Sequence, residues 1–202
     1  MKIMKKSVLV IALMLMSTTF ISAQEFVYFG VKGGVNFSSF TGDGYDDFVD
    51  PEERTSFHLG LLAEIPVSDR FSIQPEVLYS AQGYDISSMD GADDVEFQLD
   101  YINVPVLAKF YLFNRFSLEA GPQIGFLVNK EIDTNPTGDG GDISINDDNY
   151  KDVDFALGLG ASYKFSNFFV SGRYNIGLSD IYDVEGVDAK NSVIQAGVGL
   201  IF

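Results

Sequence analysis

The chain has 202 residues, with 13 Lys plus Arg, 29 Asp plus Glu, 20 Gly and no Cys or Trp, and 46% of its residues are apolar. This apolar content, with 14% aromatic residues, excludes a disordered chain despite the net charge of -16, and the length suits one domain. The lack of cysteine excludes disulfide scaffolds, thiolate zinc sites and cysteine nucleophiles. A chain with a pI near 4.2 is repelled by phosphate backbones, so we expect no nucleic acid partner.

The first 23 residues have the three regions of a secretory signal peptide. Residues 1–6 carry three lysines, residues 7–20 are almost wholly apolar, and Ala23 is a small residue before Gln24. The apolar run falls short of the roughly 20 residues that a membrane-spanning helix needs. We therefore expect a cleaved signal peptide over residues 1–23 and one exported domain over residues 24–202.

From Phe26 onward the apolar residues recur with a period of two, which is the period of a β-strand. Clusters of Gly, Asp and Asn interrupt the pattern and divide it into eight segments. The predicted strands cover residues 26–40, 56–66, 71–83, 97–112, 116–129, 152–165, 168–181 and 192–202. Most exceed the five or six residues usual in soluble proteins and match the length with which a tilted strand crosses a bilayer.

The connections between these strands alternate strictly between long and short. Short turns are predicted at residues 67–70, 113–115 and 166–167, and long polar connections at 41–55, 84–96, 130–151 and 182–191. Short turns on one side and long loops on the other are typical of an outer membrane barrel with periplasmic turns and external loops. The sequence thus predicts an all-β fold, an eight-stranded antiparallel up-and-down transmembrane β-barrel in the cell outer membrane.

The acidic residues gather in the long connections. Residues 41–55, 84–100, 130–152 and 180–190 together hold 23 Asp plus Glu against 4 Lys plus Arg. The remainder of the chain after residue 23 holds 6 of each sign. Solvated loops of this kind meet the medium or a partner first.

Side-chain parity divides each predicted strand into an apolar face and a polar face. In the last segment, for example, Ile194, Val198 and Leu200 share one face, while Gln195 and Gly197 share the other. The polar face carries four cations and four carboxylates, namely Lys32, Glu64, Glu76, Lys109, Glu119, Asp154, Lys164 and Arg173. Eight strands enclose a space that side chains fill, and buried charges persist when paired, so we expect a plugged lumen with a structural ion-pair network. The alternative is that some of these charges face water.

Aromatic residues are predicted to form girdles at both membrane interfaces. Near the short turns lie Phe26, Phe71, Phe110, Tyr111, Phe113, Phe116, Phe165, Phe168 and Phe202, and toward the long loops lie Phe57, Tyr79, Phe126, Phe155 and Tyr174.

One strand and several flanking motifs carry a family resemblance. Residues 101–112 (YINVPVLAKFYL) resemble a strand of the PorT-like outer membrane β-barrel proteins of Bacteroidota, and the segments 29–36, 74–76, 119–122 and 196–202 agree with it in order. The resemblance implies an outer membrane barrel in a family of differing roles, one member of which serves type IX secretion. The terminal Phe202 is similar to the signal by which the outer membrane assembly machinery recognises its clients.

Residues with catalytic or metal-binding chemistry are sparse. His58 is the only histidine, and Ser56 with a loop carboxylate could complete a hydrolytic set, as in some lipid-modifying barrels. Parity points His58 inward, away from lipid, so we expect no enzyme activity and no cofactor. Residues 43–47 and 146–149 are rich in oxygen ligands without the spacing of a twelve-residue calcium loop, so the sequence predicts solvated loops and leaves weak divalent cation binding open.

Several roles remain open at this stage. The lipid-embedded barrel is expected to have a structural, interaction or envelope-accessory role through its acidic loops. The alternatives are an accessory role in secretion, a small-solute channel, and a secreted lipocalin-like barrel that binds an apolar ligand. The last alternative reverses the faces, because its apolar side chains would point inward.

Overall fold

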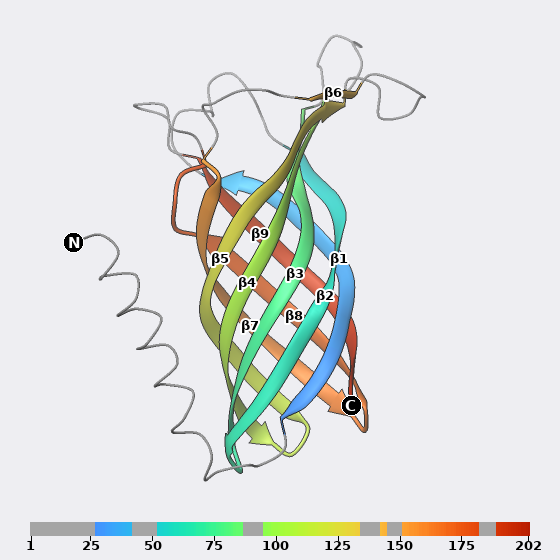
Figure 1. Cartoon of the computed structure of the whole chain (residues 1–202), viewed down its shortest axis with the longest axis vertical. Coiled ribbons are helices and arrows are strands. Elements are labelled where there is room, and N and C mark those ends of the chain that lie inside the picture. Colours follow the sequence, from blue (N-terminus) through green and yellow to red (C-terminus); the bar gives the residue numbers. More distant parts are fainter. Residues whose placement is uncertain (1–26, 42–51, 87–94, 134–141, 145–150, 182–188) are drawn as a thin grey trace, which may run out of the picture.

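The computed structural model describes residues 27–41, 52–86, 95–133, 142–144, 151–181 and 189–202. Its strands are β1 (Tyr28–Thr41), β2 (Glu52–Ser68), β3 (Phe71–Ile86), β4 (Val95–Phe113), β5 (Phe116–Asp133), β6 (Asp142–Ser144), β7 (Val153–Phe165), β8 (Phe168–Gly177) and β9 (Lys190–Ile201). All strands but β6 form one closed antiparallel barrel in the order β1-β2-β3-β4-β5-β7-β8-β9, with β9 paired back to β1 (Figure 1). Among the described residues, no helix is long and apolar enough to cross a membrane.

The eight predicted strands are confirmed, with differences at their ends. β2 begins at Glu52, and β5 runs to Asp133, so the strands extend further toward the long connections than the periodicity indicated. β8 ends at Gly177 instead of residue 181, because the chain then turns and Ile181 donates its amide hydrogen to the carbonyl of Ala189. The three-residue β6 was not predicted; it pairs with the end of β5 beyond the barrel wall.

The three short turns lie at one end of the barrel, as predicted. The β7–β8 turn consists of Ser166 and Asn167, and Ser166 has a φ of 53°. A left-handed residue of this kind allows a two-residue connection between strands that twist together. The strand ends from which the long connections leave, such as the end of β1 and the start of β2, lie at the opposite end of the barrel (Figure 1).

The two faces of each strand follow the predicted parity. On β9, Ile194, Val198 and Leu200 are 51%, 61% and 53% exposed, whereas Gln195 is 2% exposed. The other strands show the same alternation, so the barrel presents apolar side chains outward and encloses polar ones. In a soluble lipocalin-type barrel the apolar side chains would point inward instead. An outer surface of apolar side chains suits a barrel surrounded by lipid.

Glycine at one inward position permits close packing of two strands. A Cβ at Gly34 of β1 would lie 2.1 Å from the carbonyl oxygen of Ala196 on β9. In contrast, a Cβ at Gly172 on the outer face of β8 would meet nothing within 4 Å. Gly34 therefore has a steric reason to lack a side chain, and Gly172 does not.

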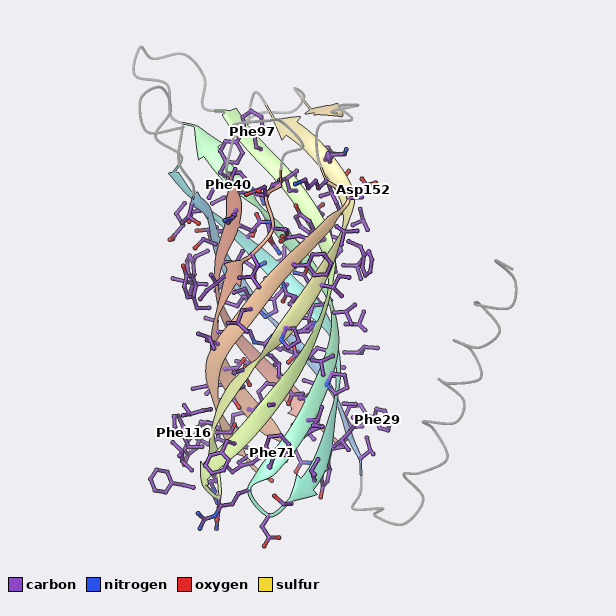
Figure 2. The ribbon with its side chains drawn as sticks, turned by 90° about the vertical axis from the view of Figure 1, so that its left-hand side faces the viewer. Phe29, Phe40, Phe71, Phe97, Phe116 and Asp152 are labelled. Carbon is purple, nitrogen blue, oxygen red and sulfur yellow. The ribbon has the colours of Figure 1, made fainter. Side chains whose placement is uncertain are left out.

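Aromatic side chains lie at both ends of the barrel (Figure 2). Phe71 and Phe116 lie at the end with the short turns. Of the residues predicted toward the long connections, Phe57, Phe126 and Phe155 are 54%, 43% and 51% exposed on the outer face. Tyr111 is the exception to the girdle prediction, which is wrong there: its side chain points into the lumen, where its hydroxyl donates a hydrogen bond to Glu64.

Candidate functional site

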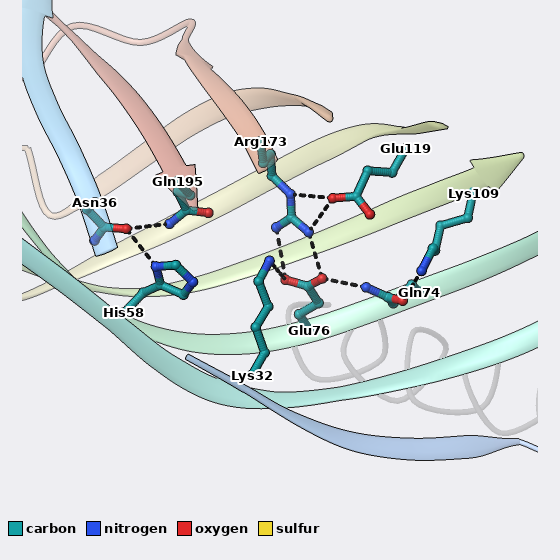
Figure 3. A network of polar contacts seen from close by, with 9 residues as sticks. All are labelled: Lys32, Asn36, His58, Gln74, Glu76, Lys109, Glu119, Arg173 and Gln195. Carbon is teal, nitrogen blue, oxygen red and sulfur yellow. Dashed lines mark hydrogen bonds and ion pairs between the residues drawn. The ribbon is translucent and has the colours of Figure 1, made fainter. Parts of the chain in front are cut away.

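The centre of the lumen contains a cluster of charged side chains around Arg173 of β8 (Figure 3). The guanidinium donates from Nη1 and Nη2 to the two carboxylate oxygens of Glu76 at 2.9 and 2.7 Å. It also donates from Nε and Nη2 to Oε1 of Glu119 at 3.1 and 3.0 Å. All three side chains are at most 1% exposed, so these charges are satisfied by one another.

Two lysines extend this cluster along the lumen. Lys32 Nζ lies 3.8 Å from Oε2 of Glu76, and Lys109 Nζ lies 3.8 Å from Oε2 of Glu64. Gln74 bridges the two parts, because its amide donates to Glu76 at 2.6 Å and its carbonyl oxygen accepts from Lys109 at 3.0 Å. The structure thus brings together three cations and three carboxylates of the predicted set, and the charges balance.

A neutral polar layer lies beside this charged cluster (Figure 3). His58 Nδ1 lies 2.8 Å from Oδ1 of Asn36, and the amide of Gln195 donates to the same oxygen at 3.0 Å. The amide of Asn36 in turn donates to Ser80 and to the carbonyl of Ala81. Parity had placed Gln195 on the polar face, but neither Gln195 nor Asn36 was predicted to form such a layer.

The two remaining residues of the predicted network lie outside the charged cluster. Asp154 accepts hydrogen bonds from Ser179 at 2.7 Å and Asn191 at 2.9 Å, so neutral donors hold it instead of a cation. Lys164 is half-buried, and its Nζ lies 5.1 Å from the centre of the Tyr28 ring. Both side chains are near an end of the barrel, since Asp154 lies at the start of β7 and Lys164 next to its last residue.

A small apolar plug, formed by Leu99, Tyr101 and Ile181, occupies the lumen toward the long connections. These residues are 1%, 1% and 2% exposed, and Phe40 and Leu127 pack against them. Ile181 comes from the connection after β8, whereas Leu99 and Tyr101 come from β4. The sequence did not indicate this plug, because Ile181 was assigned to a strand.

The family of the chain follows from its sequence as well as its architecture. The family model described as outer membrane protein beta-barrel domain matches residues 22–183. The chain belongs to this family. It is an outer membrane β-barrel.

Solved outer membrane barrels share the fold. Neisserial surface protein A is 15% identical with a TM-score of 0.58, and the match covers 86% of this chain and 97% of that one. The attachment invasion locus protein Ail of Yersinia pestis, solved with the heparin analogue sucrose octasulfate, is 18% identical with a TM-score of 0.51, covering 87% and 99%. Ail in a phospholipid bilayer nanodisc gives the same identity and TM-score, with 88% and 100% covered. A comparison with curated proteins gives no match.

The outer membrane barrel places its one histidine and the neighbouring serine in structural contacts. Ser56 donates to the carbonyl oxygen of Ala81 at 2.7 Å, and His58 contacts Asn36 instead of Ser56. Within the described ranges, no three His, Cys, Asp or Glu side chains are grouped so that they could hold a metal ion. The oxygen-rich stretches 43–47 and 146–149, like residues 1–23 and Phe26, lie outside the described residues.

Proposed function

We propose that this outer membrane barrel is a scaffold without a through-channel, and that its acidic external loops contact a cationic partner. The observation that carries the proposal is the obstructed lumen. A solute crossing the barrel would have to separate Arg173 from Glu76 and Glu119, and then pass the Ile181 plug. Both obstacles are built from side chains that are almost fully buried, so opening them would break several contacts at once.

The distribution of charge supports an interaction role for the loops. The lumen cluster is balanced, and almost all of the excess negative charge belongs to the four long connections with their 23 acidic and 4 basic residues. At the described rim, the carboxylates of Glu53 and Asp152 belong to exposed residues. A surface of this kind attracts a basic protein surface or divalent cations, with a dependence on ionic strength. No catalytic step forms part of the proposal.

The proposal includes the expected route of export. Residues 1–23 would act as the cleaved signal peptide, and Phe202 would be the residue that the assembly machinery reads. Phe202 is 72% exposed, and its backbone pairs with Phe29, so its side chain is accessible at the closing seam of the barrel.

A second candidate is an accessory role in protein secretion, as the resemblance to PorT-like proteins of Bacteroidota implies. Its support is the motif over residues 101–112, which forms most of β4 on the side of the short turns and carries Lys109 into the lumen. This candidate predicts stable co-purification with secretion components after mild detergent extraction. The scaffold proposal does not require those components.

The test uses the purified barrel in lipid. Planar bilayers containing the wild-type protein should show no discrete conductance steps, and regular steps would refute the closed lumen. Vesicles containing the protein should bind a polylysine peptide in a salt-dependent manner, and a variant with Asp43, Asp46 and Asp47 changed to Asn should bind less. The matched control is Asp69→Asn on the periplasmic turn, and equal binding by wild type and loop variant would refute the loop proposal.

A further inference from the structure

The outer face of the barrel carries an open apolar groove of about 220 Å³ near the β4–β5 turn (Figure 2). Its border toward the short turns consists of Phe116, Tyr163 and Val170, which pair across β5, β7 and β8. The next row of outward residues is small, because Ala161 pairs with Gly172. A Cβ at Gly172 would meet nothing within 4 Å, so the floor of the groove is empty of side chains there.

A cation without a carboxylate partner lies at the turn end of this groove. Arg115 directly precedes Phe116, and its carbonyl oxygen accepts the amide hydrogen of Lys164, which directly follows Tyr163, at 2.8 Å. Arg115 is exposed, and among the described residues it forms no ion pair. An arginine rests its apolar stem on an apolar surface and keeps its guanidinium at the level of the lipid headgroups.

The carboxylates at this end of the barrel are engaged elsewhere or belong to other strands. Glu64 and Glu119 are buried in the lumen, where they accept hydrogen bonds from other side chains. Asp69 belongs to the β2–β3 turn, where an arginine follows it. The terminal carboxylate of Phe202 follows β9, which pairs with β8 and β1 and not with β5 or β7. The guanidinium of Arg115 is therefore available to an anionic headgroup.

The size and place of the groove favour a lipid chain as its occupant. The volume is below the roughly 300–1,000 Å³ of pockets that enclose drug-sized molecules. Its lining of seven residues is also much smaller than the about 20–30 residues that each partner contributes to a stable protein interface. The outer face of an outer membrane barrel contacts lipid, so the groove is continuous with an interface that acyl chains already cover.

We propose that this groove binds one phospholipid with an anionic headgroup, in the leaflet at the end with the short turns. One acyl chain lies over Ala161 and Gly172, and Arg115 pairs with the headgroup. The hydroxyl of Tyr163, a residue that is 36% exposed, is a second donor for the headgroup. A zwitterionic headgroup binds less well, because its ammonium group offsets the attraction of its phosphate to Arg115. The inference does not rest on the proposed role of the long loops.

The test uses a single tryptophan as a probe, because the chain has none of its own. Phe116→Trp places the probe at the groove, and the variant is reconstituted in phosphatidylcholine vesicles. These contain equal mole fractions of bromine-labelled phosphatidylglycerol or bromine-labelled phosphatidylcholine, whose chains quench tryptophan on contact. The anionic lipid should be preferred about fivefold, since one basic residue near an anionic headgroup contributes about this factor, and high salt should reduce the preference. Equal quenching by the two lipids would overturn the proposal.

Variants assign the headgroup and the chain to their residues. In the Phe116→Trp background, Arg115→Gln should abolish the lipid preference, and Gly172→Leu should weaken quenching by the anionic lipid because it fills the floor. The control probe is Leu61→Trp, at a 63% exposed position on the outer face of β2, and it should show no lipid preference. Gel mobility with and without boiling confirms that each variant is folded.

Three results would contradict the proposed site. The first is a preference that survives both Arg115→Gln and Gly172→Leu, and the second is an equal preference at the Leu61→Trp probe, which would show general enrichment of anionic lipid around the barrel. The third is quenching at Phe116→Trp that falls as the protein-to-lipid ratio rises, because a second copy of the chain would then cover the groove.

Discussion

Removal of Glu119 should destabilise the barrel strongly, because it leaves the buried charge of Arg173 incompletely paired. Glu119→Ala removes the acceptor of two hydrogen bonds, from Nε and Nη2 of Arg173, at a site where both side chains are 1% exposed. The remaining cluster holds Arg173 and Lys32 against Glu76 alone. Breaking a buried pair in this way costs about 3–5 kcal/mol.

The assay is equilibrium unfolding in urea after insertion into lipid vesicles, followed by circular dichroism and by gel mobility with and without boiling. With an m-value of about 2 kcal/mol/M, a loss of about 4 kcal/mol lowers the unfolding midpoint by about 2 M urea. Glu53→Ala removes the same group from an exposed position and should shift the free energy by less than about 0.5 kcal/mol.

A double variant separates the charge imbalance from loss of packing. Glu119→Ala combined with Arg173→Met leaves Lys32 and Glu76 as a balanced pair. Its free energy of unfolding should therefore exceed the value expected from adding the two single losses by about 0.5–3 kcal/mol. An unchanged midpoint in Glu119→Ala, or strict additivity in the double variant, would refute the ion-pair network as a source of stability.

Three further perturbations test other parts of the barrel. Gly34→Ala should lower the free energy of unfolding by about 1–3 kcal/mol, because its Cβ would meet the β9 backbone. Gly172→Ala, on the open outer face, should leave the free energy of unfolding unchanged or slightly raised. Urea titration measures both. Ile181→Ala should lower the free energy of unfolding by about 2–5 kcal/mol through lost packing in the plug, and it should speed limited proteolysis after β8. The control is Leu178→Ala, because Leu178 is 60% exposed, and it should have neither effect. Equal cleavage of the two variants would contradict the plug. Phe202→Ala should reduce the folded barrel recovered from cells without changing refolding into vesicles, and an equal loss in both assays would assign Phe202 to stability instead of assembly.

The local pattern of the sequence was sufficient for the barrel itself. Successive strand residues point to opposite sides whatever the neighbouring strand is, so parity alone assigned Ile194 to lipid and Gln195 to the lumen. The alternation of short and long connections likewise indicated the number of strands and their up-and-down order. The predicted strands of β2 and β5 were too short, because their rim residues are too polar to continue the apolar alternation.

The contacts inside the lumen depended on the tertiary structure. Parity placed eight charged residues on the inward face. It carried no information on the position of each residue along the barrel axis or on which strand lies across the lumen from it. Glu76 and Arg173 are 97 residues apart and meet only because the register around the closed barrel brings β3 and β8 to the same level.

The same reason explains the other features that the sequence did not reveal. Asp154 has neutral partners because Ser179 and Asn191 lie at its level. Ile181 packs against Leu99 and Tyr101 because the chain leaves the barrel wall after β8. The sequence by itself determined which side chains face inward, whereas strand register and barrel closure decided which of them meet, because pairing across a lumen is a property of the closed sheet and not of any single strand.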